Sequence, residues 1–114
     1  MKEKIDLLKC LLPTIIYDNF DCIEIIECDK EIHLYLIEKY QKPISSDSRY
    51  YSKGFTEEKI IQDYPIRGKA SYLHVKRRKW LELESGNIIT NTFDLTHIGT
   101  QLTHEFVAFL KGED

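Results

Sequence analysis

Apolar and polar residues alternate with a period of two in several stretches of this chain, and this spacing restricts the fold more than any other feature of the sequence. Residues 22–25 read C-I-E-I, and residues 32–36 read I-H-L-Y-L. Successive side chains of a β-strand point to opposite faces, so the two stretches predict a β-hairpin. The turn between them has no Asn-Gly or Asp-Gly pair, and its type stays open.

A second hairpin is predicted further along the chain. Residues 59–64 and 70–80 are its two strands, and the sequence P-I-R-G at 65–68 supplies a turn with a glycine that tolerates positive φ. After another turn at 85–87, the β-branched residues of 88–93 are expected to return antiparallel to the long strand.

Helices are predicted at both ends of the chain. Apolar residues recur near helical spacing within residues 4–12, and Thr14 is a weak start signal for a second short helix that reaches residue 20. Thr103 suits the N-cap of a final helix, and Gly112 suits its end.

Together these elements predict one α+β domain with short N-terminal helices, antiparallel β-hairpins in a meander, and one C-terminal helix. Residues 1–40 form its helical start and first hairpin, residues 41–58 a loop, and residues 59–114 a basic β-meander followed by the helix. A composition of 42% hydrophobic and 31% charged residues is that of an ordinary globular domain. The apolar stretches are too short for an export signal or a membrane span, so we expect a cytoplasmic protein without membrane association.

The three cysteines predict neither a disulfide framework nor a zinc site. Cys10, Cys22 and Cys28 are odd in number and form no Cys-x-x-Cys pair. Cys22 and Cys28 stand in an apolar stretch, and we expect them to be buried as small hydrophobic residues.

The formal net charge of −3 hides a polarised chain. Residues 1–48 carry a net charge of −4, residues 49–80 of +6, and residues 81–114 of −5. Six of the sixteen Lys and Arg residues, and no acid, lie within residues 67–80. Phosphates respond to the local field, which decays over about 8 Å at physiological salt. An acidic total therefore does not exclude a nucleic-acid surface.

The predicted strand 70–80 has two different faces. Its first face, which mixes aromatic and cationic side chains, consists of Tyr72, His74, Lys76, Arg78 and Trp80. Its second face consists of Ser71, Leu73, Val75, Arg77 and Lys79. The first face suits a sugar-phosphate backbone, because lysine and arginine bind phosphate and aromatic rings offer stacking area. The alternative is a solvated strand end, since edge strands use lysine to discourage aggregation.

The chain from about residue 60 to residue 110 resembles the N-terminal region of insertion-sequence transposases, in which a DNA-binding module precedes a DDE-type, RNase H-like catalytic domain. The residues that carry the likeness are I-Q-D-Y-P-I-R-G-K-A-S-Y-L-H-V-K-R-R-K-W at 61–80 and G-T-Q-L-T-H-E-F-V-A-F-L at 99–110.

This resemblance implies binding of double-stranded DNA at the terminal inverted repeats of the element. The candidate DNA contacts, from the resemblance and from the aromatic and cationic face, are Arg67, Lys69, His74, Lys76, Arg77, Arg78 and Lys79. Most of them are assigned to phosphates, because half to two-thirds of protein–DNA hydrogen bonds go to the backbone.

The chain departs from the transposase pattern at the metal. In related transposases this segment resembles a zinc ribbon, whose paired arginines lead directly into ligand cysteines. Here Trp80 stands where a ligand would begin, and no cysteine follows Cys28. We therefore expect no metal and no cofactor, and a small apolar core around Trp80 and Phe93 in their place.

Catalysis by the DDE mechanism needs carboxylates that hold two metal ions, and this chain is too short for that fold. We expect a protein that is not an enzyme and that works with a separate or downstream DDE catalytic domain. Self-association into a homo-oligomer is a further option.

Two other classes of function are weighed against DNA binding. A small protein-interaction or adaptor domain would use the acidic ends of the chain or its tyrosines. An enzyme would need a cluster of Asp94, His97, His104 and Glu105, whose spacing matches no catalytic or metal-binding template. We expect these four residues to have capping or surface roles.

Overall fold

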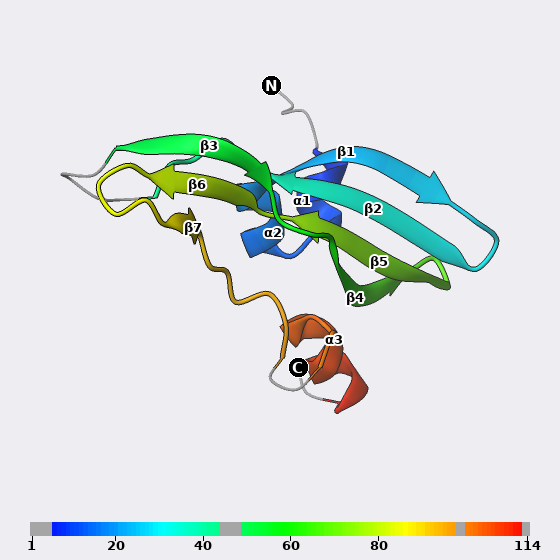
Figure 1. The fold of residues 1–114 in the computed structure, drawn as a ribbon. Helices are drawn as coiled ribbons and strands as arrows, with labels where there is room; N and C mark the ends of the chain where they lie inside the picture. The colour runs from blue at the N-terminus through cyan, green and yellow to red at the C-terminus, as the bar shows by residue number, and fades with distance from the viewer. Residues whose placement is uncertain (1–5, 44–48, 98–99, 113–114) are drawn as a thin grey trace, which may run out of the picture.

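Within residues 6–43, 49–97 and 100–112, which the computed structural model describes, three helices and seven strands form an α+β fold (Figure 1). The expected fold class is confirmed. In chain order the elements are α1 (Leu7–Leu11), α2 (Thr14–Asn19), β1 (Phe20–Glu27), β2 (Glu31–Glu38), β3 (Tyr50–Phe55), β4 (Lys59–Ile66), β5 (Lys69–Lys76), β6 (Arg78–Glu82), β7 (Ile88–Thr90) and α3 (His104–Leu110).

The strands form two sheets, which we call sheet A and sheet B. Sheet A has the order β1-β2-β5-β4, and sheet B has the order β3-β6-β7. The predicted hairpins β1–β2 and β4–β5 and the predicted antiparallel return of β7 on β6 are confirmed. The two hairpins of sheet A meet through β2 and β5, which run parallel with Leu34 opposite Leu73. Nothing in the local alternation predicted this parallel pair.

Sheets A and B share one long, bent hairpin. Residues 50–66 run antiparallel to residues 69–82, with Tyr50 opposite Glu82 at one end and Ile66 opposite Lys69 at the other. Its first half joins sheet B and its second half joins sheet A, so the hairpin links the two sheets end to end (Figure 1).

The bend of this hairpin interrupts the long strand that the sequence predicts over 70–80. Residue Arg77 lies between β5 and β6, outside both. Thr56 bridges the gap, because its main-chain N–H donates to the Arg77 carbonyl at 2.8 Å and its Oγ1 accepts from the Arg77 N–H at 3.0 Å.

The predicted loop at 41–58 is wrong in its second half. Residues 50–55 form β3, an edge strand of sheet B that pairs with β6. Residues 44–48 of the predicted loop lie outside the described residues. A β-bulge at Lys53 and Gly54 breaks the alternation of β3, and this irregularity hides the strand in the sequence.

The main core lies between the inner face of sheet A and the N-terminal helices. Its buried side chains are Leu12, Ile16, Phe20, Leu34, Leu36, Ile61, Leu73, Val75 and Leu95. Burying a side chain of this kind contributes about 1.5–3 kcal/mol. In Figure 1, α1 and α2 lie behind the sheet, and none of the described helices lies on the opposite, outer face of sheet A.

The small apolar core expected around Trp80 and Phe93 is divided between two places. Trp80 is fully buried in sheet B, where the ring of Tyr40 meets it edge-on at 5.1 Å. Phe93 instead packs against Phe20 of the main core, with ring centroids 5.2 Å apart. The two aromatic residues therefore stabilise different sheets.

The helix ends follow the sequence signals closely. The Thr103 side chain accepts from the N–H of Phe106 and caps α3, and Gly112 has a φ of 73° just beyond its end. The predicted helix at 4–12 covers only Leu7–Leu11 among the described residues, and Asp6 caps it. The expected burial of the cysteines is wrong for Cys28, which is exposed, while Cys22 is half-buried.

Candidate nucleic-acid interface

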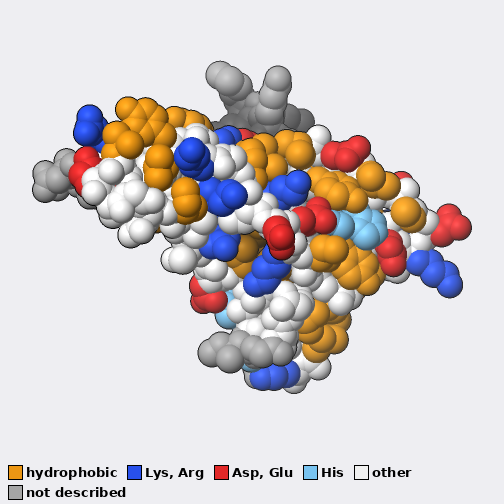
Figure 2. All heavy atoms as spheres, in the orientation of Figure 1, with side chains coloured by type: hydrophobic (Ala, Val, Ile, Leu, Met, Phe, Trp, Pro, Cys, Tyr) orange, Lys and Arg blue, Asp and Glu red, His pale blue; other side chains and the backbone are white. Residues whose placement is uncertain are grey.

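Lysine and arginine side chains gather around the bend of the long hairpin. Figure 2 shows them across the middle of one face, over the region where β5 leads into β6. Lys53 and Lys76 are exposed and Lys79 is half-buried, and the ion pairs found among the described residues involve none of the three. These three ammonium groups are therefore available to an external anion.

Arg77 is held in place by neutral oxygen atoms. Its Nη1 donates to Thr90 Oγ1 at 3.3 Å and to the carbonyl oxygen of Asn91 at 3.1 Å. No carboxylate neutralises this guanidinium within the described part of the chain. The positive charge of Arg77 is therefore not neutralised by these contacts, although its Nη1 group already donates to oxygen atoms of the protein.

The side chain of Arg78 is held by a hydrogen bond and by contacts with two aromatic rings. Its Nε–H donates to the carbonyl oxygen of Glu38 at 2.9 Å. Its guanidinium carbon lies 4.8 Å from the ring centre of Phe55 and 5.3 Å from that of Tyr40. Cation–π contacts of this kind and a charge-assisted hydrogen bond fix the side chain between the two sheets. Arg78 is therefore mainly a structural residue.

The two basic residues at the tip of the β4–β5 hairpin differ in their surroundings. Lys69 Nζ lies 2.5 Å from Glu27 Oε2, so a carboxylate of the chain covers this predicted contact. The Lys69 charge also lowers the pKa of the Glu27 carboxyl, through the hydrogen bond first and the field second. Arg67 is exposed in the turn, where it takes a left-handed φ of 54°.

His74 is largely buried on sheet A. The residue is only 7% exposed, and its ring stacks on Tyr35 with a centroid distance of 4.2 Å. Its Nε2 lies 2.7 Å from Nδ1 of His33, and its Nδ1 lies 3.0 Å from Glu58 Oε1 without good hydrogen-bond alignment. Glu31 contacts the far nitrogen of His33 at 2.9 Å. The structure gives the prediction of His74 as a DNA contact no support, because its ring belongs to a chain of polar contacts on sheet A.

Two cations near the bend were missed by the sequence analysis. Lys53 lies in the bulge of β3, and Lys59 begins β4 opposite Val75. Lys53 was assigned to the loop 41–58 and Lys59 to the start of the strand 59–64, and neither was named as a DNA contact. The hairpin pairing brings Lys53 near Lys79, and Lys59 lines the same pocket as Arg77. In the sequence, the net charge of +6 over residues 49–80 was the feature that pointed to these two lysines.

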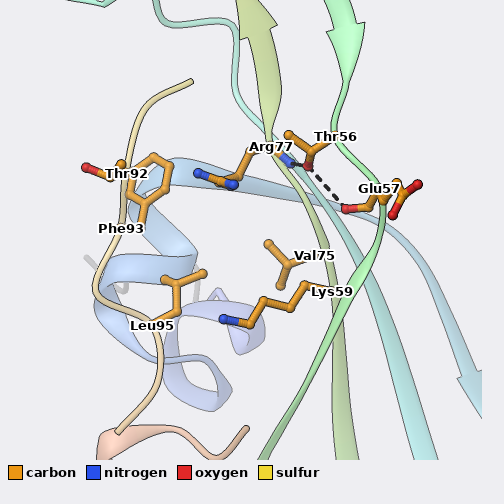
Figure 3. Close-up of a pocket in the computed structure, with 8 residues that line it drawn as sticks. All are labelled: Thr56, Glu57, Lys59, Val75, Arg77, Thr92, Phe93 and Leu95. Atoms are coloured by element: carbon orange, nitrogen blue, oxygen red, sulfur yellow. Dashed lines mark hydrogen bonds between the residues drawn. The ribbon is translucent and has the colours of Figure 1, made fainter. Parts of the chain in front are cut away.

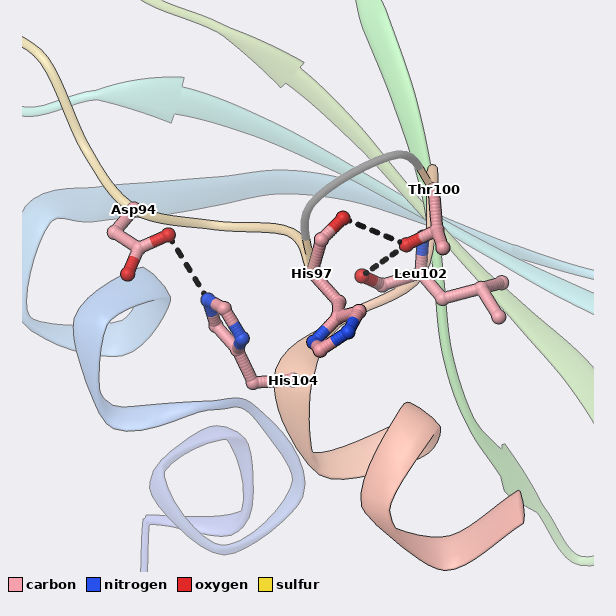
Figure 4. A network of polar contacts seen from close by, with 5 residues as sticks. All are labelled: Asp94, His97, Thr100, Leu102 and His104. Atoms are coloured by element: carbon pink, nitrogen blue, oxygen red, sulfur yellow. Dashed lines mark hydrogen bonds and ion pairs between the residues drawn. The ribbon is translucent and has the colours of Figure 1, made fainter. Parts of the chain in front are cut away.

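The cluster considered for enzymatic chemistry does come together in part. His104 Nε2 lies 2.9 Å from Asp94 Oδ1, and the rings of His97 and His104 meet edge-on at 5.9 Å (Figure 4). Both members of the Asp94–His104 pair are exposed, so the pair adds little stability. Across the described residues, no group of three or more His, Cys, Asp or Glu side chains is arranged to hold a metal ion.

Hydrogen bonds among His97, Thr100 and Leu102 hold the main chain next to this cluster. The hydroxyl of Thr100 donates to the carbonyl oxygen of His97 at 2.9 Å (Figure 4). The His97 N–H donates to the carbonyl oxygen of Leu102 at 3.0 Å. The loop leads into the N-cap Thr103. A role in positioning α3 accounts for these contacts.

A buried carboxylate, that of Asp63, lies within β4. Asp63 accepts from Thr103 Oγ1 at 2.7 Å, and burial raises the pKa of its carboxyl. The pKa of Glu105 is raised by desolvation and by the Asp63 charge. The two acids face a cleft of about 370 Å³ beside Pro13. This cleft repels phosphate and does not belong to the basic surface.

The comparisons with known proteins add no family to this description. No protein-family model matches the chain, and neither the curated proteins nor the solved structures include a significant match. None of the helices in the described residues has the length and apolar composition needed to cross a membrane.

Proposed function

We propose that this protein is a non-catalytic DNA-binding module that holds the sugar-phosphate backbone of a duplex at the bend of its long hairpin. The observation that carries the proposal is the group of unpaired ammonium ions at Lys53, Lys76 and Lys79, together with the uncompensated guanidinium of Arg77. Like charges gathered on one surface repel one another, and an anionic partner relieves that repulsion.

The expected binding mode is phosphate recognition. Lysine is a point charge on a flexible stem, which suits phosphate contacts better than base reading. The resemblance to transposase N-terminal regions makes the ends of an insertion sequence the proposed target, and a separate catalytic domain the proposed partner.

The test measures DNA affinity as a function of salt with the double variant Lys76→Gln/Lys79→Gln. Each phosphate contact contributes about −0.9 to the slope of log affinity against log salt. We expect the slope for a terminal-repeat duplex to become less steep by about 2 in the variant. A scrambled duplex should respond in the same way, because the lysines contact the backbone.

A charge-matched control separates local contacts from net charge. Lys30 lies in the β1–β2 turn and Lys111 follows α3, and both are distant in the fold from the bend. The double variant Lys30→Gln/Lys111→Gln loses the same formal charge and should keep the wild-type slope. Equal slopes in both double variants would remove the bend from the DNA-binding site.

A protein-interaction domain is the second candidate, and one observation favours it. The outer face of sheet A exposes Ile23, Ile26 and Ile60 at 61%, 41% and 48% of their surface. Ile23 and Ile26 lie on the edge strand β1 and Ile60 on the opposite edge strand β4, so this face offers apolar side chains at both edges of the sheet to a partner. Binding through this face would be insensitive to salt, whereas DNA binding would weaken steeply, so one salt titration of the purified complex distinguishes the two.

A further inference from the structure

A cavity lies at the bend of the hairpin, and Lys53, Lys76 and Lys79 are not among the residues that line it. A hollow of about 500 Å³ lies between the hairpin and the segment 92–95 that follows β7. The residues that line it are Thr56, Glu57, Lys59, Val75, Arg77, Thr92, Phe93 and Leu95 (Figure 3). It lies on the inner side of the hairpin, since Val75 and Leu95 belong to the core beneath sheet A.

Two cations from opposite strands of the hairpin point into this cavity. In Figure 3 the side chains of Lys59 and Arg77 both extend from the hairpin toward the 92–95 segment, above and below Val75. The only acid of the lining, Glu57, points away from the hollow. No ion pair of the described residues involves Lys59 or Arg77. The cavity therefore carries two uncompensated positive charges.

Arg77 is also preorganised for a ligand. Its Nη1 is fixed by Thr90 Oγ1 and the carbonyl oxygen of Asn91, while its Nε–H and Nη2 groups have no acceptor among the described residues. A guanidinium has five N–H donors in a rigid fork that matches a phosphate. Holding one end of the fork lowers the entropy cost of binding at the other end.

Part of the cavity wall is apolar. Val75, Phe93 and Leu95 form this part, beside the polar side chains of Thr56 and Thr92, and the Phe93 ring is half-buried. A cavity of this size with an apolar wall and a few converging charges is typical of a small-molecule site. An aromatic ring beside two cations suits an anion with a flat organic part.

From this arrangement we infer that the cavity is a phosphate-ester site. A phosphate contacts the Lys59 ammonium and the free edge of the Arg77 guanidinium, and the organic part of the ligand packs against Phe93. The same chemistry is offered by a free mononucleotide and by a phosphate of a nucleic-acid backbone. The site is separate from Lys53, Lys76 and Lys79, and it exists whether or not those lysines bind DNA.

The experiment compares three probes by calorimetric titration: inorganic phosphate, adenosine 5′-monophosphate and a 12-base-pair duplex. For Lys59→Gln we expect about tenfold weaker binding of the occupant, because one charge-assisted contact is lost. Lys30→Gln is the matched control, since it removes an exposed lysine that does not line the cavity and lies away from the bend, in the β1–β2 turn. Circular dichroism verifies that both variants keep the fold.

The probes also separate the two sources of the phosphate. If adenosine 5′-monophosphate binds more tightly than inorganic phosphate, and Phe93→Leu removes this preference, the occupant is a free nucleotide. If only the duplex responds to Lys59→Gln, the occupant is a backbone phosphate. If no probe responds to Lys59→Gln in folded protein, the site does not exist. Nucleotide binding without duplex binding would leave the site standing and refute the DNA-binding proposal alone.

Discussion

The main-chain N–H of Arg78 donates to Oε1 of Glu38 at 3.0 Å, while Nε–H of the same arginine donates to the Glu38 carbonyl oxygen at 2.9 Å. These two hydrogen bonds, both donated by Arg78, join the end of β2 to the start of β6. Glu38 is fully buried, and its Oε2 also accepts from Asn91 Nδ2 at 2.7 Å. One carboxylate thus ties sheet A to sheet B and to the segment after β7.

Replacing Glu38 by glutamine should destabilise the protein. The substitution conserves the shape of the side chain but gives it a donor that faces the amide of Asn91 or the main-chain N–H of Arg78. A buried donor without an acceptor costs about 1–3 kcal/mol. Urea unfolding followed by circular dichroism measures this difference, and an unchanged free energy of unfolding would show that the junction does not depend on the carboxylate.

Arg78→Lys should weaken the fold more than it weakens DNA binding. Lysine keeps the charge but loses the hydrogen bond to the Glu38 carbonyl oxygen and the planar stack between Tyr40 and Phe55. We expect the free energy of unfolding to fall by about 1–3 kcal/mol.

The salt slope of DNA affinity tests the second half of this prediction. This test needs a variant without the charge, because lysine would still neutralise a phosphate. Since Arg78 is occupied inside the protein, the slope for Arg78→Gln should match that of the wild type under conditions where both are folded. A slope that becomes less steep by about 0.9 would return Arg78 to the list of phosphate contacts.

The buried carboxyl of Asp63 contributes a stabilisation that decreases as the pH rises. Burial raises the pKa of its carboxyl above the ordinary value of 3.8, so the folded state holds this proton more tightly than the unfolded state. The resulting stabilisation is complete below the unfolded pKa and is lost as the pH rises through the folded pKa. As the pH rises above about 4, the free energy of unfolding should therefore fall less for Asp63→Asn than for the wild type. Thermal unfolding across this pH range measures the effect, and identical pH profiles would contradict it.

The same substitution should act on Glu105. Desolvation and the Asp63 charge both raise the pKa of Glu105, and only the second cause disappears in Asp63→Asn. A titration of the Glu105 carboxyl by NMR should give a lower pKa in the variant than in the wild type. A control with Asp29→Asn, in the β1–β2 turn, should leave the Glu105 value in place, because Asp29 is not among the causes of its shift.

The turn at Arg67 offers a test of backbone strain. Arg67 and Gly68 are the two loop residues between β4 and β5, with φ angles of 54° and 78°. A two-residue hairpin loop with both φ angles positive favours Asn-Gly. Arg67→Asn should raise the free energy of unfolding by about 0.5 kcal/mol, while Arg67→Val should lower it by about 1 kcal/mol.

These two variants remove the same charge, so they also separate strain from electrostatics. Chemical denaturation of both proteins at one salt concentration supplies the comparison. If asparagine and valine shift the stability equally, the charge of Arg67 rather than its backbone conformation controls the turn.

The local features of this fold follow from the sequence alone. The period-two alternation predicts the hairpins β1–β2 and β4–β5, and Thr103 and Gly112 predict the limits of α3. These features depend on side-chain direction and on hydrogen bonds within a few residues, and the residue types carry that information directly.

The arrangement of the site was decided by tertiary structure. The parallel pairing of β2 with β5 joins segments about forty residues apart, and it follows from burying both strands over one core. That pairing brings His33 to His74, and the bend at Arg77 turns one predicted strand into parts of two sheets. Which cations stay free depends on partners supplied from a distance, such as Glu27 for Lys69 and Glu38 for Arg78. Spacing along a chain describes the faces of one strand, whereas the neutralisation of a charge depends on long-range packing.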